Sequence, residues 1–286
     1  MMEFGPEPSG RVFPGRQLEN MGYRWKVASE TPDKWWTGYP GLPFSTEGMG
    51  TEEGRRAIYQ KMVRDYMRCA AAIDDNIGRL LDFLDSEGLS NNTIVVYVSD
   101  QGYFLGEHGF FDKRIMYEEP LRMPMVIRYP KEIPAGTRNM DMVLNIDFAA
   151  LLADYAGAVP PTGNQGASFR CNLKSGGSGS FRESIYYRYW TQERIRPAHF
   201  GIRDGRYKLI FFYGNALLPD FDGDEGNLWE FYDLEADPHE NSNAYRGLQY
   251  ADIIASMKKE LIRLRKEVGD TIETPEIQKI IGTHFR

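Results

Sequence analysis

Residues 93–114 read TIVVYVSDQGYFLGEHGFFDKR, a continuous apolar run followed directly by a polar, glycine-rich segment. The apolar residues of 93–98 do not alternate with polar ones, which is typical of a strand buried on both faces of a parallel sheet. Asn91 and Asn92 form a turn before the strand, and a helical pattern precedes the turn. Helix, turn and buried strand predict half of a doubly wound α/β unit.

The polar residues after this strand are candidates for a binding site. Asp100 and Gln101 stand where ligands bind in open α/β sheets, outside the carboxyl end of a strand. A carboxylate beside an amide oxygen suits a hard divalent cation, although an Asp here could equally end the strand through backbone hydrogen bonds. Lys113 and Arg114 add two cations that would hold an anion against such a metal, as in phosphoryl or sulfuryl transfer, or would lie in solvent.

The helix before the strand is predicted over residues 51–88. Apolar side chains recur every three or four residues from Ile58 to Leu84, and Gly88 is a natural stop. Cys69 lies on this apolar stripe, so we expect a buried structural thiol there and not a nucleophile.

Two further elements extend the α/β region downstream. Residues 123–129 form a second apolar strand, and a helix is expected from Asn145 to Ala156, with Gly157 ending it. The Pro and Gly/Ser clusters within 158–182 then indicate a boundary or an exposed loop.

The chain changes type after this boundary. Strands are predicted at 183–190, at 199–213 as a hairpin turning at Asp204-Gly205, and at 229–234, followed by an amphipathic helix at 250–267. We therefore expect an α/β part at residues 1–172, with an irregular lead-in over 1–50, and a small antiparallel sheet-and-helix subdomain at 173–286.

Composition excludes several classes of function. The 286 residues carry a net charge of −7, which argues against a nucleic-acid surface, and 42% hydrophobic residues exclude a disordered chain. No apolar run long enough for a membrane span and no secretory signal is present in the sequence. Two cysteines cannot form a disulfide framework.

The segment from Ser99 to Pro130 closely resembles the sulfatase family of the alkaline-phosphatase-like superfamily, and bacterial carbohydrate sulfatases in particular. The matching pieces are Ser99–Gly102, Leu105–Gly109, Lys113, Met116–Glu119 and Met123–Pro130. The resemblance extends over about residues 51–270 and includes 203–209 and 232–240. It implies the C-terminal part of a doubly wound, mostly parallel sulfatase-type sheet followed by the small antiparallel subdomain.

The resemblance also implies roles for individual residues. Asp100 and Gln101 would be two ligands of Ca²⁺ (or Mg²⁺), shared with residues missing from this chain, and Lys113 would contact the sulfate and support the departing oxygen. The substrate-binding candidates are His108, His199 and Arg203. For His108 an alternative stays open, in which a neutral imidazole only braces the loop.

One family motif is missing from the chain. Sulfatases convert a Cys or Ser in Cys/Ser-x-Pro-x-Arg to formylglycine, whose hydrate attacks sulfur, and no such motif occurs here. The Asp74-Asp75 pair lies inside the long helix, so we interpret it as a solvated face and not as the family's first-strand metal ligands. We therefore expect a C-terminal sulfatase portion that lacks its N-terminal half and is inactive alone.

Three functions remain open at this point. The first is a sulfuric ester hydrolase that acts, when complete, on sulfated carbohydrate. The second is a degenerate, non-catalytic protein that binds sulfated glycan or metal, and the third is a phosphodiester or phosphonate hydrolase of the same superfamily. The family is often periplasmic or secreted, but this sequence leaves the compartment undefined.

Overall fold

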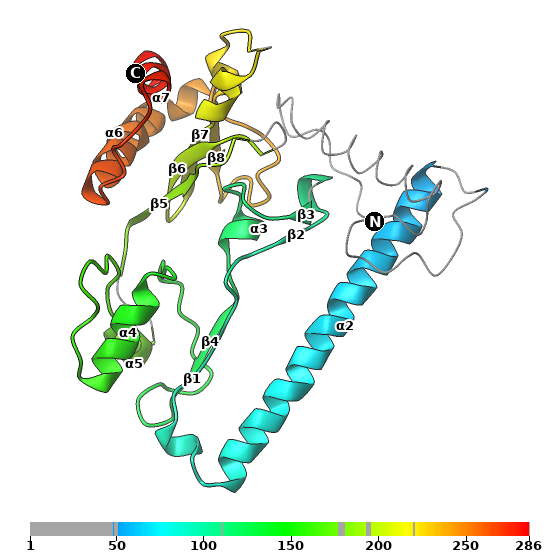
Figure 1. Cartoon of the computed structure of the whole chain (residues 1–286), viewed down its shortest axis with the longest axis vertical. Coiled ribbons are helices and arrows are strands. Elements are labelled where there is room, and N and C mark those ends of the chain that lie inside the picture. Colours follow the sequence, from blue (N-terminus) through cyan, green and yellow to red (C-terminus); the bar gives the residue numbers. More distant parts are fainter. Residues whose placement is uncertain are drawn as a thin grey trace.

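The computed structural model describes residue 48 and residues 51–109, 111–176, 181–192, 196–219 and 221–285 (Figure 1). The predicted lead-in at 1–50 lies outside the described residues, except for Gly48. The helices are α2 (Thr51–Ser86), α3 (Glu118–Leu121), α4 (Asp147–Ala156), α5 (Arg170–Ser175), α6 (Ala251–Glu267) and α7 (Pro275–His284). The strands are β1 (Val95–Val98), β2 (Phe104–Leu105), β3 (Phe111–Asp112), β4 (Met125–Arg128), β5 (Ser184–Tyr189), β6 (His199–Asp204), β7 (Tyr207–Phe211) and β8 (Trp229–Asp233).

An antiparallel sheet in the order β5-β6-β7-β8 forms the best-packed part of the molecule. The predicted hairpin is confirmed as β6 and β7, which pair with Phe200 opposite Phe211. The Asp204 carboxylate accepts the amide N–H groups of Arg206 (2.8 Å) and Tyr207 (2.6 Å), so it stabilises the turn.

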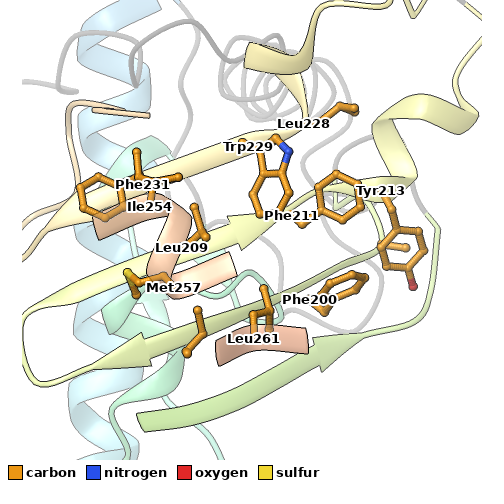
Figure 2. Packing of buried hydrophobic residues seen from close by; sticks show 12 residues of the cluster. Phe200, Leu209, Phe211, Tyr213, Leu228, Trp229, Phe231, Ile254, Met257 and Leu261 are labelled. Carbon is orange, nitrogen blue, oxygen red and sulfur yellow. The ribbon is translucent and has the colours of Figure 1, made fainter. Parts of the chain in front are cut away.

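One face of this sheet is covered by α6 and α7. Figure 2 shows how the rings of Phe211 and Trp229 lie over the strands, with Leu261 of α6 packed beside them. The ring centroids of Phe211 and Trp229 are 4.5 Å apart. Burial of apolar side chains on both sides of this interface holds the helices against the sheet.

The opposite face of the sheet is covered by the segment that follows the predicted strand end. Phe104, Met116 and Tyr117 of this segment pack against Phe212 and Tyr232 in a second buried cluster. The sheet is therefore a central layer, with α6 and α7 on one side and Phe104 and residues 115–117 on the other.

The two apolar runs predicted as parallel-sheet strands pair with each other in the antiparallel sense. β1 and β4 align Val95 with Arg128 and Val98 with Met125. Within the described residues neither strand has a second partner, and Val126 is 62% exposed. The expectation of a parallel pair buried on both faces therefore differs from the observed pairing, because a continuous apolar run indicates burial without fixing strand direction.

Helix α2 confirms the predicted span but stands apart from the four-stranded sheet (Figure 1). Ile73 and Leu80 on its apolar stripe are exposed, and so is Cys69. The prediction of a buried Cys69 was wrong, because in the described part of the chain the stripe is buried at Leu84 but exposed around Cys69 and Ile73. Asp74 and Asp75 are exposed, as predicted.

Three α-helices among the described residues were not predicted from the sequence, namely α3, α5 and α7. α5 falls at the expected boundary, and α7 begins at Pro275, where the Thr274 hydroxyl accepts the N–H of Ile277 as an N-cap. None of the helices among the described residues is both long enough and apolar enough to cross a membrane.

The packing of α6 predicts that alanine substitutions at two neighbouring aliphatic residues will lower the free energy of unfolding by different amounts. Leu261 is fully buried against the sheet, whereas Ile262 is 50% exposed. We expect Leu261→Ala to lower the free energy of unfolding by about 2–5 kcal/mol, measured by urea denaturation. The control, Ile262→Ala, should have a much smaller effect, and equal losses would contradict the assigned face of α6.

Candidate active site

Asp100 and Gln101 lie directly after β1, as predicted. The Ser99 hydroxyl donates to the Gln101 carbonyl at 2.7 Å, which closes a tight turn. The Gln101 side-chain nitrogen donates to the Pro120 carbonyl at 3.0 Å, while the Asp100 side chain is exposed. With its nitrogen anchored, the Gln101 amide keeps its oxygen Oε1 as the atom able to bind a cation.

Gly102 allows this turn to lie against the chain at residues 119–120. A Cβ on Gly102 would come within 2.0 Å of the Glu119 carbonyl oxygen, so no other residue fits without a backbone shift. The Gly102 N–H donates to the Pro120 carbonyl at 3.0 Å. The turn at residues 100–102 is therefore in direct backbone contact with Glu119 and Pro120, at the end of the Met-Tyr-Glu-Glu segment.

His108 lies between β2 and β3 with a left-handed φ of +55°. Its side chain is almost fully buried, and its ring centroid is 4.7 Å from that of Tyr117. The His108 Nε2 atom is 3.8 Å from Oε2 of Glu119, whose pKa is raised by burial. These contacts place the His108 imidazole beside Tyr117 and Glu119.

Lys113 follows β3 and is partly exposed. The next residue, Arg114, has a φ of +94°, which is unusual for any residue other than glycine. The Tyr187 hydroxyl of β5 donates to the Arg114 carbonyl at 3.0 Å. The backbone beside Lys113 is thus held by the four-stranded sheet.

His199 is completely buried on β6. Its Nδ1 lies 2.7 Å from the Pro197 carbonyl, and its Nε2 lies 3.2 Å from the Met116 amide nitrogen. A carbonyl only accepts and an amide N–H only donates, so this geometry requires a neutral ring protonated on Nδ1. Backbone groups therefore engage both ring nitrogens.

Arg203 also reaches the Met-Tyr-Glu-Glu segment. Its guanidinium donates to both carboxylate oxygens of Glu118, at 2.9 and 3.2 Å. The structure thus brings His199 and Arg203 to the same stretch of chain, on Met116 and Glu118 respectively.

Two residues that the sequence reasoning missed complete this contact. The Lys208 ammonium is fully buried between the carboxylates of Glu118 (2.9 Å) and Glu240 (2.6 Å). Oε2 of Glu240 also accepts the Glu118 amide N–H at 2.7 Å. The available signal was a lysine inside the otherwise apolar run of β7, since a buried lysine needs an acidic partner.

Burial and the neighbouring charges together shift the pKa values of the two carboxyl groups in opposite directions. Burial disfavours the ionised form of Glu118, but Lys208 and Arg203 outweigh it and lower the pKa of Glu118 to about 2. Burial raises the pKa of Glu240 to about 7, against the opposing attraction of Lys208.

The donor set for a metal in this chain is small. No group of three or more His, Cys, Asp or Glu side chains that could hold a metal occurs within the described residues. Asp100 and Gln101 supply two oxygen ligands of the kind that Ca²⁺ and Mg²⁺ prefer, so these residues fit such an ion as part of a larger shell.

Comparison with known families identifies the class. The C-terminal model of N-sulphoglucosamine sulphohydrolase matches residues 106–267, and the sulfatase model matches residues 19–158. The chain therefore belongs to the sulfatase family, with its α/β fold of the alkaline-phosphatase-like superfamily.

Individual relatives agree with this assignment. The chain is 42% identical over 249 residues to an N-acetylglucosamine-6-O-sulfatase of Bacteroides thetaiotaomicron, covering 85% of this chain and 42% of the relative. It is 26% identical over 229 residues to the N-acetylglucosamine-6-sulfatase of Homo sapiens, covering 72% and 41%. The chain spans about two fifths of the length of these curated relatives.

Solved structures show the same fold. One, a protein in complex with its substrate D-glucosamine-2-N,6-O-disulfate, is 40% identical with a TM-score of 0.70, covering 80% of this chain and 45% of that one. A phosphonate monoester hydrolase from Silicibacter pomeroyi is 21% identical with a TM-score of 0.60, covering 92% and 50%. The second likeness shows the fold alone.

The lowered pKa of Glu118 predicts a specific loss of stability in acid. Because the folded pKa of about 2 lies below the ordinary value of 4.5, this carboxylate stabilises the fold above pH 4.5 and loses that effect as the pH falls toward 2. We expect the wild-type chain to lose about 3 kcal/mol more than Glu118→Gln between pH 5 and pH 2, in urea denaturation at each pH. Exposed Glu276→Gln is the control, and parallel curves for wild type and Glu118→Gln would contradict the assigned pairing.

Proposed function

We propose that this chain is the C-terminal part of a sulfuric ester hydrolase that acts on sulfated carbohydrate, with a 6-O-sulfated N-acetylglucosamine unit as the substrate class. The observation that carries the proposal is the 42% identity, over 249 residues, to the N-acetylglucosamine-6-O-sulfatase of Bacteroides thetaiotaomicron. The stretch with the Asp100-Gln101 pair and Lys113 lies in the half of the chain that the sulfatase model matches.

In this proposal each site residue has a separate role in binding the metal, binding the sulfate or positioning another residue. Asp100 and Gln101 hold part of the shell of a Ca²⁺ or Mg²⁺ ion, which when bound would neutralise charge on the sulfate. Lys113 places its ammonium against the sulfate and supports the departing oxygen, because charge that develops there must be neutralised. His108 braces the loop, while Arg203 fixes Glu118 through its two hydrogen bonds.

The division of the chain also belongs to this proposal. Residues 1–172 contribute to the α/β catalytic part and residues 173–286 form the smaller subdomain. A polypeptide equivalent to the N-terminal part of the relatives would cover the exposed apolar side chains of α2 and β4, such as Leu80 and Val126. It would also supply the formylglycine nucleophile, since the 286-residue sequence contains no Cys/Ser-x-Pro-x-Arg motif.

That missing motif supports one alternative, a non-catalytic protein that only binds sulfated glycan. The two can be separated by supplying the missing part. In a chimera, the N-terminal part of the Bacteroides relative would precede residues 51–286 of this chain.

We expect the 286-residue chain alone to give no turnover of an aryl sulfate, and the chimera to hydrolyse N-acetylglucosamine 6-sulfate. Lys113→Ala should lower kcat of the chimera by about 100-fold or more, because it removes a positive charge that stabilises the transition state. Lys131, an exposed lysine, provides the matched control Lys131→Ala, which should stay near the unmodified chimera.

Turnover by the chain alone would contradict the need for a further nucleophile. A chimera that cleaves a phosphonate monoester in preference to the sulfate would favour the phosphonate hydrolase, and a chimera that binds without cleaving would favour the binding protein.

A second prediction concerns the metal. Ca²⁺ takes six to eight oxygen ligands, so the two from Asp100 and Gln101 should bind it with a dissociation constant above about 1 mM. Titration calorimetry on the 286-residue chain measures this dissociation constant directly. The control is Asp100→Asn, which removes the one carboxylate of the Asp100-Gln101 pair. Submicromolar binding would mean that another set of ligands exists in the chain.

A further inference from the structure

We propose that Tyr187 and His199 are positioning residues for Lys113, acting on it through the backbone of Arg114 and Met116. This inference rests on the proposed function, because it concerns the placement of the lysine that contacts the sulfate. Neither residue makes or breaks a bond in the reaction.

The first observation is a regular series of contacts along residues 114–118. The Arg114 carbonyl accepts from the Tyr187 hydroxyl at 3.0 Å, and the Met116 N–H donates to Nε2 of His199 at 3.2 Å. Two residues further on, the Glu118 N–H donates to the Glu240 carboxylate at 2.7 Å. Two of these hydrogen bonds come from side chains of the sheet and the third from Glu240 in the turn after β8, so three groups outside the segment fix the register of residues 114–118.

The second observation is that both anchors are themselves fixed. The rings of Tyr187 and His199 lie nearly parallel, with centroids 5.8 Å apart, and the Pro197 carbonyl holds the other nitrogen of His199. Burial raises the pKa of Tyr187 to about 12, so its hydroxyl stays protonated and able to donate.

The sheet also leaves room for the segment. A Cβ on Gly201 of β6 would lie 2.6 Å from the sulfur of Met116, so the glycine allows the Met116 side chain to enter the sheet face. Met116 is completely buried there. Residues 114–118 are therefore seated in a site shaped for them.

The third observation is the backbone of Arg114 itself. A φ of +94° is sparsely populated by residues with a Cβ, and such conformations persist only where surrounding contacts impose them. The Tyr187 hydroxyl acts on the carbonyl of this same residue. Because Arg114 follows Lys113 directly, the direction in which the lysine leaves the backbone depends on this conformation. A small displacement of a charge from its productive position is costly in catalysis.

The test uses the 286-residue chain with Tyr187→Phe, which removes only the hydroxyl. Its control is Tyr186→Phe on the same strand, whose hydroxyl donates to Asp270 between α6 and α7. Two quantities are measured by mass spectrometry: amide hydrogen exchange, and competitive acetylation of Lys113 relative to exposed Lys259.

We expect Tyr187→Phe to speed amide exchange in 113–118 about tenfold, with exchange in β7 unchanged. The acetylation ratio of Lys113 to Lys259 should change at least threefold, and Tyr186→Phe should leave both quantities as in the wild type. Adding Arg114→Gly to Tyr187→Phe should restore the ratio, since glycine adopts a positive φ without strain.

Faster exchange throughout β7 would show a merely structural role and overturn the proposal. An unchanged Lys113 ratio, or no rescue by Arg114→Gly, would overturn it as well. Neither readout uses turnover, so these outcomes leave the sulfatase proposal standing. An inactive chimera would instead refute the sulfatase proposal, while the exchange and acetylation results would still decide whether Tyr187 positions Lys113.

Discussion

The structure depends on one buried charge, the Lys208 ammonium enclosed by the carboxylates of Glu118 and Glu240. Burying an ammonium group costs free energy unless carboxylates pair with it, and removing either carboxylate would leave an uncompensated buried charge. The three residues come from β7, from α3 and from the turn after β8. The ion pairs of Lys208 therefore form only when the sheet and the Met-Tyr-Glu-Glu segment are packed together.

This requirement explains how the small sheet serves the candidate site. Its α6 face carries the large apolar cluster and, at the β5 edge, the ion pairs of Arg188 with Asp270 and Glu273. Its other face combines apolar contacts with hydrogen bonds to residues 114–118. Apolar contacts alone would tolerate a sliding segment, but hydrogen bonds at every second residue fix its register. Side chains that act on a substrate need such rigid support, which loops lack unless a scaffold provides it.

The sequence predicted the elements whose local pattern is strong. The hairpin of β6 and β7, the long helix α2 and the end of α4 at Gly157 follow from turn chemistry and periodicity, and the structure confirms them. The place of Asp100 and Gln101 after a strand followed in the same way.

The remainder depends on contacts between distant residues, which a local pattern does not contain. The exposure of Cys69 is set by what covers α2, and the antiparallel sense of β1 and β4 by partners that an apolar run does not specify. The pairing of Glu118 with Lys208 joins residues far apart in the chain. A resemblance to sulfatases pointed to the right segments, but only the fold shows that they meet.

The claim that the sheet holds the candidate site in one arrangement is tested most directly by amide hydrogen exchange in the unmodified chain. The account predicts that the amides of Met116 and Glu118 are protected to within about tenfold of the Leu209 amide in β7, because all three are hydrogen-bonded inside one cooperative unit. If Met116 and Glu118 instead exchange as fast as the exposed Leu248 while Leu209 stays protected, the sheet does not hold the segment and the account is contradicted.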